Sequence, residues 1–368
     1  MIRLARPEDD EDLRAILREN SMAGDIALTF EREPNYFIAA RVEASEQQIV
    51  VGEDPVTKTV VGMGSRSIRT LYINGQARPF GYLSQFRISP EYRAMRRGFT
   101  QAWQMMKELH QDGRTPFYYT SIIEDNLPAR RLLTRGLPGL PTYLEYARMH
   151  TLALYSRRRK KHTQPPGGLR IQRGSAQTQA AILDCLQRNL PRYQFAPHWD
   201  AALLFSPQDT PGLSPEDFFI ALDGDIAVGC IALWDQGAFK QTVVRGYTKR
   251  VRYFRWAINL TAGPLGLPTL PREHAKLKHA YASHLAVDRD DPGVYDALLR
   301  TLYNHAVEEG FLYFVIGLCD HHPFLERTRD AYAHIDYPSL LYLVHWDADQ
   351  DPRAVLDDRL PAPEMAIL

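Results

Sequence analysis

The fold is decided by residues 81–113, GYLSQFRISPEYRAMRRGFTQAWQMMKELHQDG. Residues 82–89 alternate in character and are rich in aromatic and β-branched side chains, which predicts a strand. Pro90 ends that strand, because proline has no N–H to donate to a sheet. Over residues 98–110 no further Gly or Pro occurs and apolar side chains recur every three or four positions, which predicts a helix with one apolar face. The predicted order is strand, short basic turn, helix.

The turn between this strand and this helix carries Arg93, Arg96 and Arg97, followed by Gly98. The start of a helix offers unpaired N–H groups and the positive end of the helix dipole. One guanidinium group can donate to two phosphate oxygens at once. A glycine lets a ligand approach the backbone closely. The turn is therefore predicted to bind a pyrophosphate.

At these residues the sequence resembles the GNAT acetyltransferase superfamily. The coenzyme signature of that family has Arg or Gln, two residues, Gly, one residue, and then Gly or Ala, between the fourth strand and the third helix. Arg93 fills the first position and Gly98 the last, whereas Arg96 stands where the first Gly is usual. The strand phrase YLSQFRISPEYR also has the family's form, an apolar strand followed by Pro-x-x-Arg.

A second coenzyme motif of the family follows about thirty residues later. A predicted strand at 117–123 leads to Asn126, then to Ala129 on a helix and to Gly136 after it. The alternative is an unrelated α/β nucleotide-binding unit, but P-loop and dinucleotide fingerprints are absent from the sequence.

The resemblance implies acetyl-CoA, or another acyl-CoA, as a co-substrate. Backbone groups of Phe86, Arg87 and Ile88 would hold the pantetheine arm and polarise the thioester carbonyl, and Asn126 would contact the pantetheine from the other side. The residues assigned to the pyrophosphate are Arg93, Arg96, Arg97, Gly98 and Phe99.

The acid and the base are harder to assign. Many family members carry a Glu on the fourth strand and a Tyr seven residues after the Asn, but residues 82–89 contain no carboxylate and Leu133 takes the place of the Tyr. Glu124 is the candidate base, directly or through water, or else an ordinary surface residue beside a turn. Three further alternatives stay open: acid–base duty on Tyr118, Tyr119 or Tyr143, catalysis by positioning alone, and binding of acyl-CoA without turnover.

Composition limits the choice of function. A chain of 368 residues is long enough for two domains. It has 44 Lys and Arg and 44 Asp and Glu, so its net charge is zero and does not favour a nucleic-acid partner. The three cysteines are far apart in apolar surroundings, which indicates reduced core residues, with no disulfide frame or metal site. No apolar run of about 18 residues is present, so we expect a cytoplasmic protein with no membrane partner.

The chain before the decisive stretch predicts a meander. Strands are expected at 47–51 and 59–63, and Asn74-Gly75 is a strong hairpin signal between strands at 67–73 and 76–89. In acetyltransferases the segment equivalent to 20–33 borders the acceptor site. After the decisive stretch, a pair of strands is expected within 143–155.

A basic tract rich in Pro and Gly, residues 156–168, then interrupts the chain. We interpret it as a solvated linker; the alternative is a nucleic-acid or membrane patch. Beyond it the chain repeats itself: residues 227–231 echo 60–64, and residues 281–287 echo 82–88 at an offset of 199. Because the echoes keep their order, we expect two copies of one fold.

The predicted fold class is α+β, with two tandem acetyltransferase-like domains, each a mostly antiparallel central sheet in a mixed α/β/α arrangement flanked by helices. The expected limits are 1–155 for the coenzyme-binding domain, 156–168 for the linker, 169–350 for a degenerate second domain and 351–368 for a tail.

The second copy lacks the chemistry of the first. Carboxylates at Asp288 and Asp290 stand where the pyrophosphate site should be, so this copy is expected to shape the acceptor cleft. The adjacent pair His321 and His322, with Asp320, is weighed as a metal site. Adjacent side chains diverge and no further ligand has a clear spacing, so no metal is predicted. An insertion at about 236–280 mixes basic and aromatic residues, which favours an interface or substrate wall over nucleic acid.

The hypothesis is an acyl-CoA-dependent N-acyltransferase that acetylates the amine of a small molecule or peptide by direct attack in a ternary complex. Its rival is a non-catalytic acyl-CoA-binding or sensor protein. A more distant alternative acts on nucleic acid or a protein through the basic insertion.

Overall fold

The computed structural model describes residues 1–22, 24–92, 96–265, 269–346 and 351–368. Arg93 of the predicted pyrophosphate site lies outside these ranges. Arg96 and Arg97 begin a helix, but their side chains also lie outside the described part.

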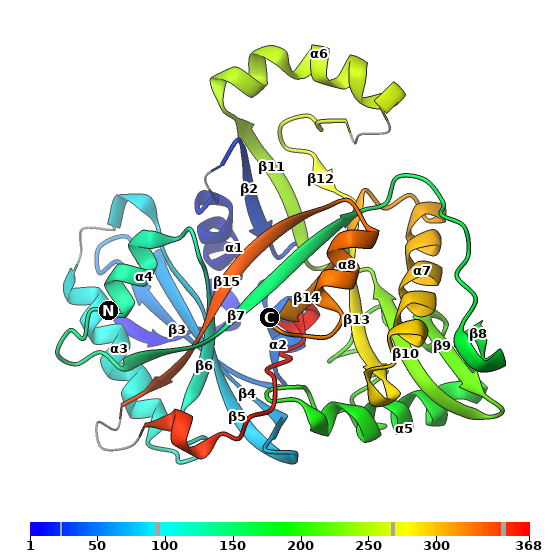
Figure 1. Ribbon diagram of the computed structural model, residues 1–368. Coiled ribbons are helices and arrows are strands. Elements are labelled where there is room, and N and C mark those ends of the chain that lie inside the picture. Colours follow the sequence, from blue (N-terminus) through cyan, green and yellow to red (C-terminus); the bar gives the residue numbers. More distant parts are fainter. Residues whose placement is uncertain (23, 93–95, 266–268, 347–350) are drawn as a thin grey trace.

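Within the described ranges, twelve strands form one mixed sheet that runs through both halves of the chain (Figure 1). Its order is β1-β3-β4-β5-β6-β15-β7-β14-β13-β10-β9-β8. The strands of the first half are β1 (Ile2–Leu4), β3 (Glu46–Glu53), β4 (Val60–Ile73), β5 (Gln76–Ile88), β6 (Tyr118–Ile123) and β7 (Thr142–Tyr155). Those of the second half are β8 (Arg170–Arg173), β9 (Phe218–Asp223), β10 (Ile226–Trp234), β13 (His279–Val287), β14 (Tyr313–Cys319) and β15 (His334–His345).

Helices cover this sheet in both halves (Figure 1). The first half has α1 (Asp10–Glu19), α2 (Tyr36–Glu43), α3 (Arg96–His110) and α4 (Leu127–Leu133), and the second has α5 (Gln179–Asn189), α7 (Pro292–Glu308) and α8 (Leu325–Ala331). The predicted mixed α+β fold class is confirmed.

The antiparallel meander and its hairpin are confirmed, but the strands expected at 59–63 and 67–73 are one strand of 14 residues, β4. Strands β3, β4 and β5 pair antiparallel in sequence order. Asn74 and Gly75 both have positive φ, 51° and 78°, which is the two-residue turn that suits the twist of a hairpin. The β5 strand ends at Ile88, before Pro90, as predicted.

The repeat is visible in the backbone of β5 and β13. Each strand pairs parallel with the next strand over only two or three residues, Gly81 and Tyr82 in one half and His279 to Tyr281 in the other. Each then carries a bulge with one residue in the left-handed region, Gln85 (φ 57°) and His284 (φ 54°). These two residues are 199 positions apart, which is the offset of the sequence echo.

The two halves exchange strands at the centre of the sheet (Figure 1). Strand β7 of the first half pairs antiparallel with β14 of the second, and β15 of the second half pairs antiparallel with β6 of the first. The expected pair of strands within 143–155 is wrong: β7 is a single strand of 14 residues. It stays continuous because partners from the other half pair with it along both edges. The predicted domain limits remain a prediction.

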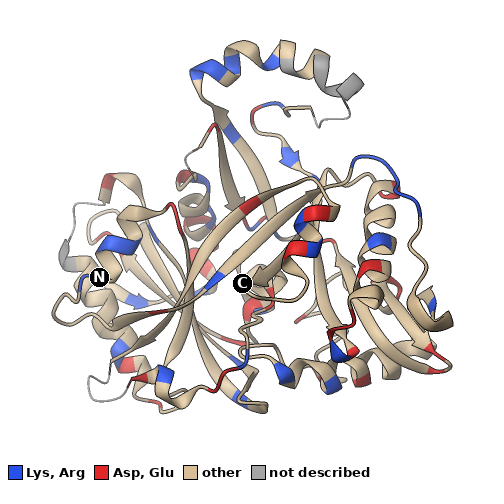
Figure 2. Ribbon diagram, in the orientation of Figure 1, with Lys and Arg blue, Asp and Glu red and all other residues tan. Residues whose placement is uncertain are grey.

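A second, smaller sheet joins the insertion to the first half. Strand β11 (Gln241–Tyr247) pairs with β2 (Ile26–Glu31) and with β12 (Lys276–Leu277), and α6 (Lys249–Leu265) projects beyond it. The linker carries a run of basic residues past α7 (Figure 2). It is exposed along most of its length, yet the Lys160 N–H donates to Asn304 Oδ1 at 2.8 Å, so it is anchored to that helix.

Among the described residues, no helix is long and apolar enough to span a bilayer.

Candidate functional site

A split in the sheet opens between β5 and β6. These strands pair only at Gly81–Tyr118 and Tyr82–Tyr119, and beyond that point they diverge. The bulge at Gln85 bends β5 away from its partner, as bulges do. Phe86, Arg87 and Ile88, which sequence analysis assigns to the pantetheine arm, lie in the diverging part of β5.

The α3 helix packs on one side of this split through Trp103 and Met106, which are both buried. The Phe86 ring stacks on Trp103, with ring centroids 4.6 Å apart and 23° between the planes. The Phe99 ring meets the same indole edge-on, with centroids 6.2 Å apart. Both phenyl rings therefore belong to the packing under the helix, which leaves their backbone groups as the possible ligand contacts.

Gly98 lies in the first turn of α3. Among the described residues outside its own helix turn, a Cβ atom added there would meet no atom within 4 Å. Packing against these residues therefore does not require a glycine at this position.

Asn126 and Glu124 follow β6. Asn126 caps α4, and its Oδ1 accepts from the Ala129 N–H at 3.3 Å. Glu124 Oε2 accepts two hydrogen bonds from Arg148, at 2.6 and 3.0 Å. Neither side chain borders the large cavity described below, so the roles assigned to them stay predictions.

The three alternative tyrosines lie in the core. The Tyr118 hydroxyl accepts from Arg66 Nε at 2.8 Å, and the Tyr119 ring stacks on Phe195. Burial raises the pKa of Tyr143 well above its usual value. None of the three borders the cavity.

A cavity of about 410 Å³, here called the central cavity, lies between the two halves. Its walls come from β5, β6, β7, β13, β14 and β15 of the main sheet and from β2, β11 and β12 of the small one. Gln85 and Arg87 of β5 and Ser121 and Ile123 of β6 line it, so the cavity adjoins the split. Most of its remaining lining is apolar or aromatic.

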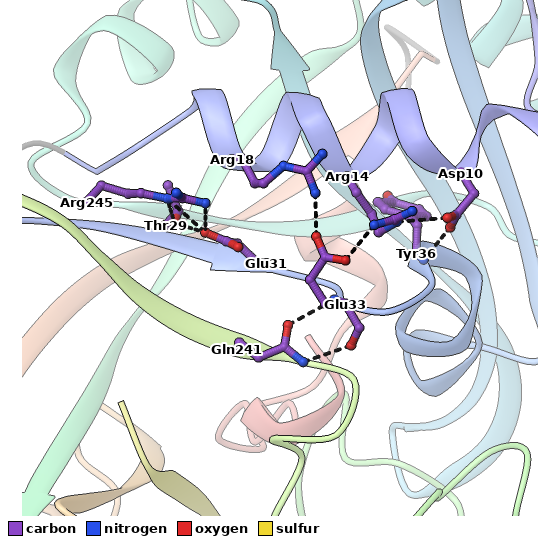
Figure 3. A network of polar contacts seen from close by, with 9 residues as sticks. All are labelled: Asp10, Arg14, Arg18, Thr29, Glu31, Glu33, Tyr36, Gln241 and Arg245. Carbon is purple, nitrogen blue, oxygen red and sulfur yellow. Dashed lines mark hydrogen bonds and ion pairs between the residues drawn. The ribbon is translucent and has the colours of Figure 1, made fainter. Parts of the chain in front are cut away.

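The insertion forms one wall of the central cavity and is held there by polar contacts (Figure 3). Gln241 of β11 exchanges two hydrogen bonds with the backbone of Glu33, at 2.9 and 2.8 Å. The Glu33 carboxylate accepts from Arg14 and Arg18 of α1, and Arg245 of β11 pairs with Glu31 at 2.5 Å. Strand β11 of the insertion thus forms the predicted interface with the first half. On α6 the aromatic side chains of Tyr253, Phe254 and Trp256 are exposed, so that part of the insertion does not pack as an interface. The role of a substrate wall stays a prediction.

Three cationic side chains line the central cavity: Arg32, Arg87 and Lys240. Arg32 is buried and ion-paired with the buried Glu43, which also accepts from Ser84 Oγ at 3.0 Å. Burial, together with the neighbouring Arg32, lowers the pKa of Lys240 from 10.5 to about 7 and lowers the pKa of Arg87. From the sequence, only the backbone of Arg87 was expected at the site. The cluster itself could not be predicted, because its members come from separate segments and no local pattern joins them.

The sequence and the fold of this chain were compared with those of known proteins. No family model matches the sequence, and no curated protein sequence matches it. Several solved structures do match.

A GCN5-related N-acetyltransferase from Sphaerobacter thermophilus aligns over 95% of this chain and 98% of its own, with 14% identity and a TM-score of 0.56. N-myristoyltransferase of Saccharomyces cerevisiae with bound myristoyl-CoA aligns over 97% of this chain and 87% of its own, with 10% identity and a TM-score of 0.59. A GCN5-related N-acetyltransferase from Anabaena variabilis aligns over 93% and 72%, with 11% identity and a TM-score of 0.52.

The chain has a tandem GNAT acetyltransferase fold. At these identities the likeness concerns the fold, so the site must be argued from this chain's own residues.

In the second half of the tandem GNAT fold, the chain's own tail fills the corresponding split between β13 and β14. The His284 N–H donates to Glu364 Oε2 at 2.8 Å. A Cβ atom at Gly317 of β14 would lie 2.9 Å from Met365 Cβ, so the tail packs directly against that strand. A cavity of only about 50 Å³ remains there.

The carboxylates that replace the pyrophosphate site in this half of the GNAT fold are ion-paired. Asp288 pairs with Arg188 at 3.1 Å and Asp290 with Arg192 at 2.7 Å. These ion pairs join the turn after β13 to α5 and to the short segment that follows α5.

The residues weighed as a metal site in this half have other partners. Asp320 pairs with His150 at 2.6 Å, and the His322 ring stacks on Tyr193. No group of three or more possible metal ligands occurs among the residues that the structure describes.

Proposed function

We propose that this chain is an acyl-CoA-dependent N-acyltransferase that transfers an acetyl group, or another acyl group, to the amine of a small molecule or peptide. The observation that carries the proposal is the position of the β5–β6 split. Its β5 residues contact α3 through the stack of Phe86 on Trp103, and Gln85 and Arg87 line the central cavity. A thioester in that split would face an acceptor in the cavity.

The proposed reaction is a direct attack in a ternary complex. The acceptor nitrogen attacks the thioester carbonyl carbon, a C–N bond forms, the C–S bond breaks, and CoA leaves as the thiol after it takes a proton. The pantetheine arm would be held by backbone groups of Phe86, Arg87 and Ile88, and by Asn126. Backbone N–H groups aimed at the thioester oxygen would stabilise the negative charge that develops there.

The pyrophosphate is assigned to the turn before α3 and its first residues, namely Arg93, Arg96, Arg97, Gly98 and Phe99. The second half is proposed to take no coenzyme, because the tail occupies its split. Glu124 remains the proposed base, acting directly or through water.

Thermal denaturation with CoA and acetyl-CoA tests the coenzyme site. A ligand at 100 times its Kd stabilises a protein by about 2.7 kcal/mol, and we expect the wild type to be stabilised. Arg93→Ala with Arg97→Ala should weaken the effect. As a control, Arg158→Ala with Arg170→Ala removes the same charge from exposed positions and should leave it intact. No stabilisation of the wild type would contradict the proposal.

A turnover assay separates catalysis from mere binding. Release of the CoA thiol from acetyl-CoA is followed with a panel of amines, and we expect release that depends on the acceptor. The non-catalytic alternative is favoured by the lack of a carboxylate on β5 and by Leu133. Coenzyme binding without acceptor-dependent release of CoA would select that alternative.

A further inference from the structure

The cationic cluster of the central cavity is a feature that acyl transfer alone does not require. Arg87 comes from the diverging part of β5, Arg32 from the segment between β2 and α2, and Lys240 from the residue before β11. All three line the central cavity, and Arg87 lies at the β5–β6 split itself.

Within the described part of the chain, Arg87 is the member of this cluster that lacks an anionic partner. Lys240 donates to backbone oxygens of Ala366 and Leu368, at 3.1 and 3.4 Å. Arg32 has Glu43 as its partner, and the nearby Glu31 is already paired with Arg245. Arg87 has no ion pair or hydrogen bond within the described part, and its Nε and Arg32 Nη1 are buried without a partner there. A buried guanidinium that lacks an anion is costly, so its presence in a cavity points to an anionic ligand.

The other walls indicate what surrounds the anion. Tyr82, Tyr281, Tyr313 and Phe30 bring aromatic surface into the cavity. A volume of about 410 Å³ is enough for a small organic molecule. The planar fork of a guanidinium matches the two oxygens of a carboxylate.

We propose that the central cavity binds an acceptor with an apolar, preferably aromatic, body and a carboxylate group, and that Arg87 holds this carboxylate with Arg32 and Lys240 beside it. The inference rests on the proposed function, since it names the class of amine that would be acylated. The substrate would be an amine that also carries a carboxylate, as an apolar amino acid does.

The test uses a matched pair of probes, 3-phenylpropionate and 3-phenylpropionamide, which differ in the charge and hydrogen bonding of one group. Titration calorimetry on the full chain without coenzyme measures both affinities. The wild type should bind the acid roughly tenfold more tightly than the amide, as expected for charge-assisted hydrogen bonds. Arg87→Met should remove that preference and leave the amide affinity nearly unchanged.

Arg170→Met is the control, because Arg170 is an exposed arginine on β8, and it should keep the preference for the acid. Equal affinity for the two probes, no binding of either, or a preference that survives Arg87→Met would overturn the inference.

A second measurement, the melting temperature, shows whether Arg87→Met loses binding only because its fold is destabilised. Removing a buried cation that lacks a partner should raise the melting temperature of the unliganded protein. A lower melting temperature for Arg87→Met would argue that the arginine is structural, and would overturn the inference.

These results are separable from those of the proposed function. The probes are titrated without coenzyme, so selectivity for the acid can appear in a chain that never turns over. A coenzyme-dependent thermal shift without selectivity for the acid would keep the acyltransferase proposal and reject the carboxylate site.

Discussion

Lys240 offers a test of how strongly the central cavity is shielded from water. Its largely buried ammonium group donates to backbone oxygens of Ala366 and Leu368, at 3.1 and 3.4 Å, and lies near the charge of Arg32. Both burial and Arg32 disfavour the protonated form. Lys240→Met keeps most of the side-chain volume and removes the charge.

The expected magnitude follows from the pKa of Lys240, which falls from 10.5 to about 7 on folding. Each pKa unit corresponds to 1.36 kcal/mol, so the full destabilisation is on the order of 5 kcal/mol. Because the folded pKa lies below the unfolded one, the penalty is absent above about pH 10.5. It grows as the pH falls and is complete below about pH 7. Between pH 9 and pH 6 the wild type should therefore lose about 3 kcal/mol relative to Lys240→Met.

Urea unfolding of both proteins at pH 6, 7.5 and 9 measures this difference. The hydrogen bonds lost with the ammonium group, about 1 kcal/mol each, shift all three values alike and drop out of the comparison. Lys107→Met, at an exposed position on α3, is the control and should show no such trend. A difference between wild type and Lys240→Met that stays constant from pH 6 to pH 9 would refute the reasoning.

Three further predictions follow from the first half. Gly98→Ala should leave the protein as stable or up to about 1 kcal/mol more stable, since alanine favours a helix and its Cβ meets no atom of the described residues within 4 Å. It should also weaken CoA binding in calorimetry, and unchanged binding would argue against close approach of the coenzyme. Phe86→Ala removes the stack on Trp103 and should lower the free energy of unfolding by about 2–4 kcal/mol in urea titrations; a loss below about 1 kcal/mol would contradict the packing role. Glu124→Gln should reduce kcat by about 10²–10⁴-fold without a change in melting temperature if Glu124 is the base; an unchanged kcat would reject that role.

Local signals in the sequence predicted much of the fold. Asn74-Gly75 specifies its turn through its own backbone preferences, and Pro90 ends a strand by its own chemistry. The repeat was also visible in the sequence, because residues 281–287 resemble residues 82–88, which lie 199 positions earlier. These features depend on neighbours in the chain, which a sequence displays directly.

Other features depend on partners that are distant in the chain. Gln85 and His284 adopt positive φ without being glycines, and only the bulges in their strands require it. The β7 strand looked like two strands because its partners lie in the other half.

The candidate site shows the same limit. The turn before α3 could be found from spacing, whereas Arg32 and Lys240, which are 208 positions apart, meet only in the folded protein.

The exchange of β7 and β15 has a consequence for how the protein can be assembled. Neither half can finish its own sheet, because each closing strand is supplied from across the centre. In a dimer, the same exchange of strands would be called domain swapping between protomers. Here the linker at 156–168 joins the two halves, so the exchange takes place within one chain. A chain cleaved in this linker should thus behave as two interlocked fragments, each serving as the template on which the other completes folding.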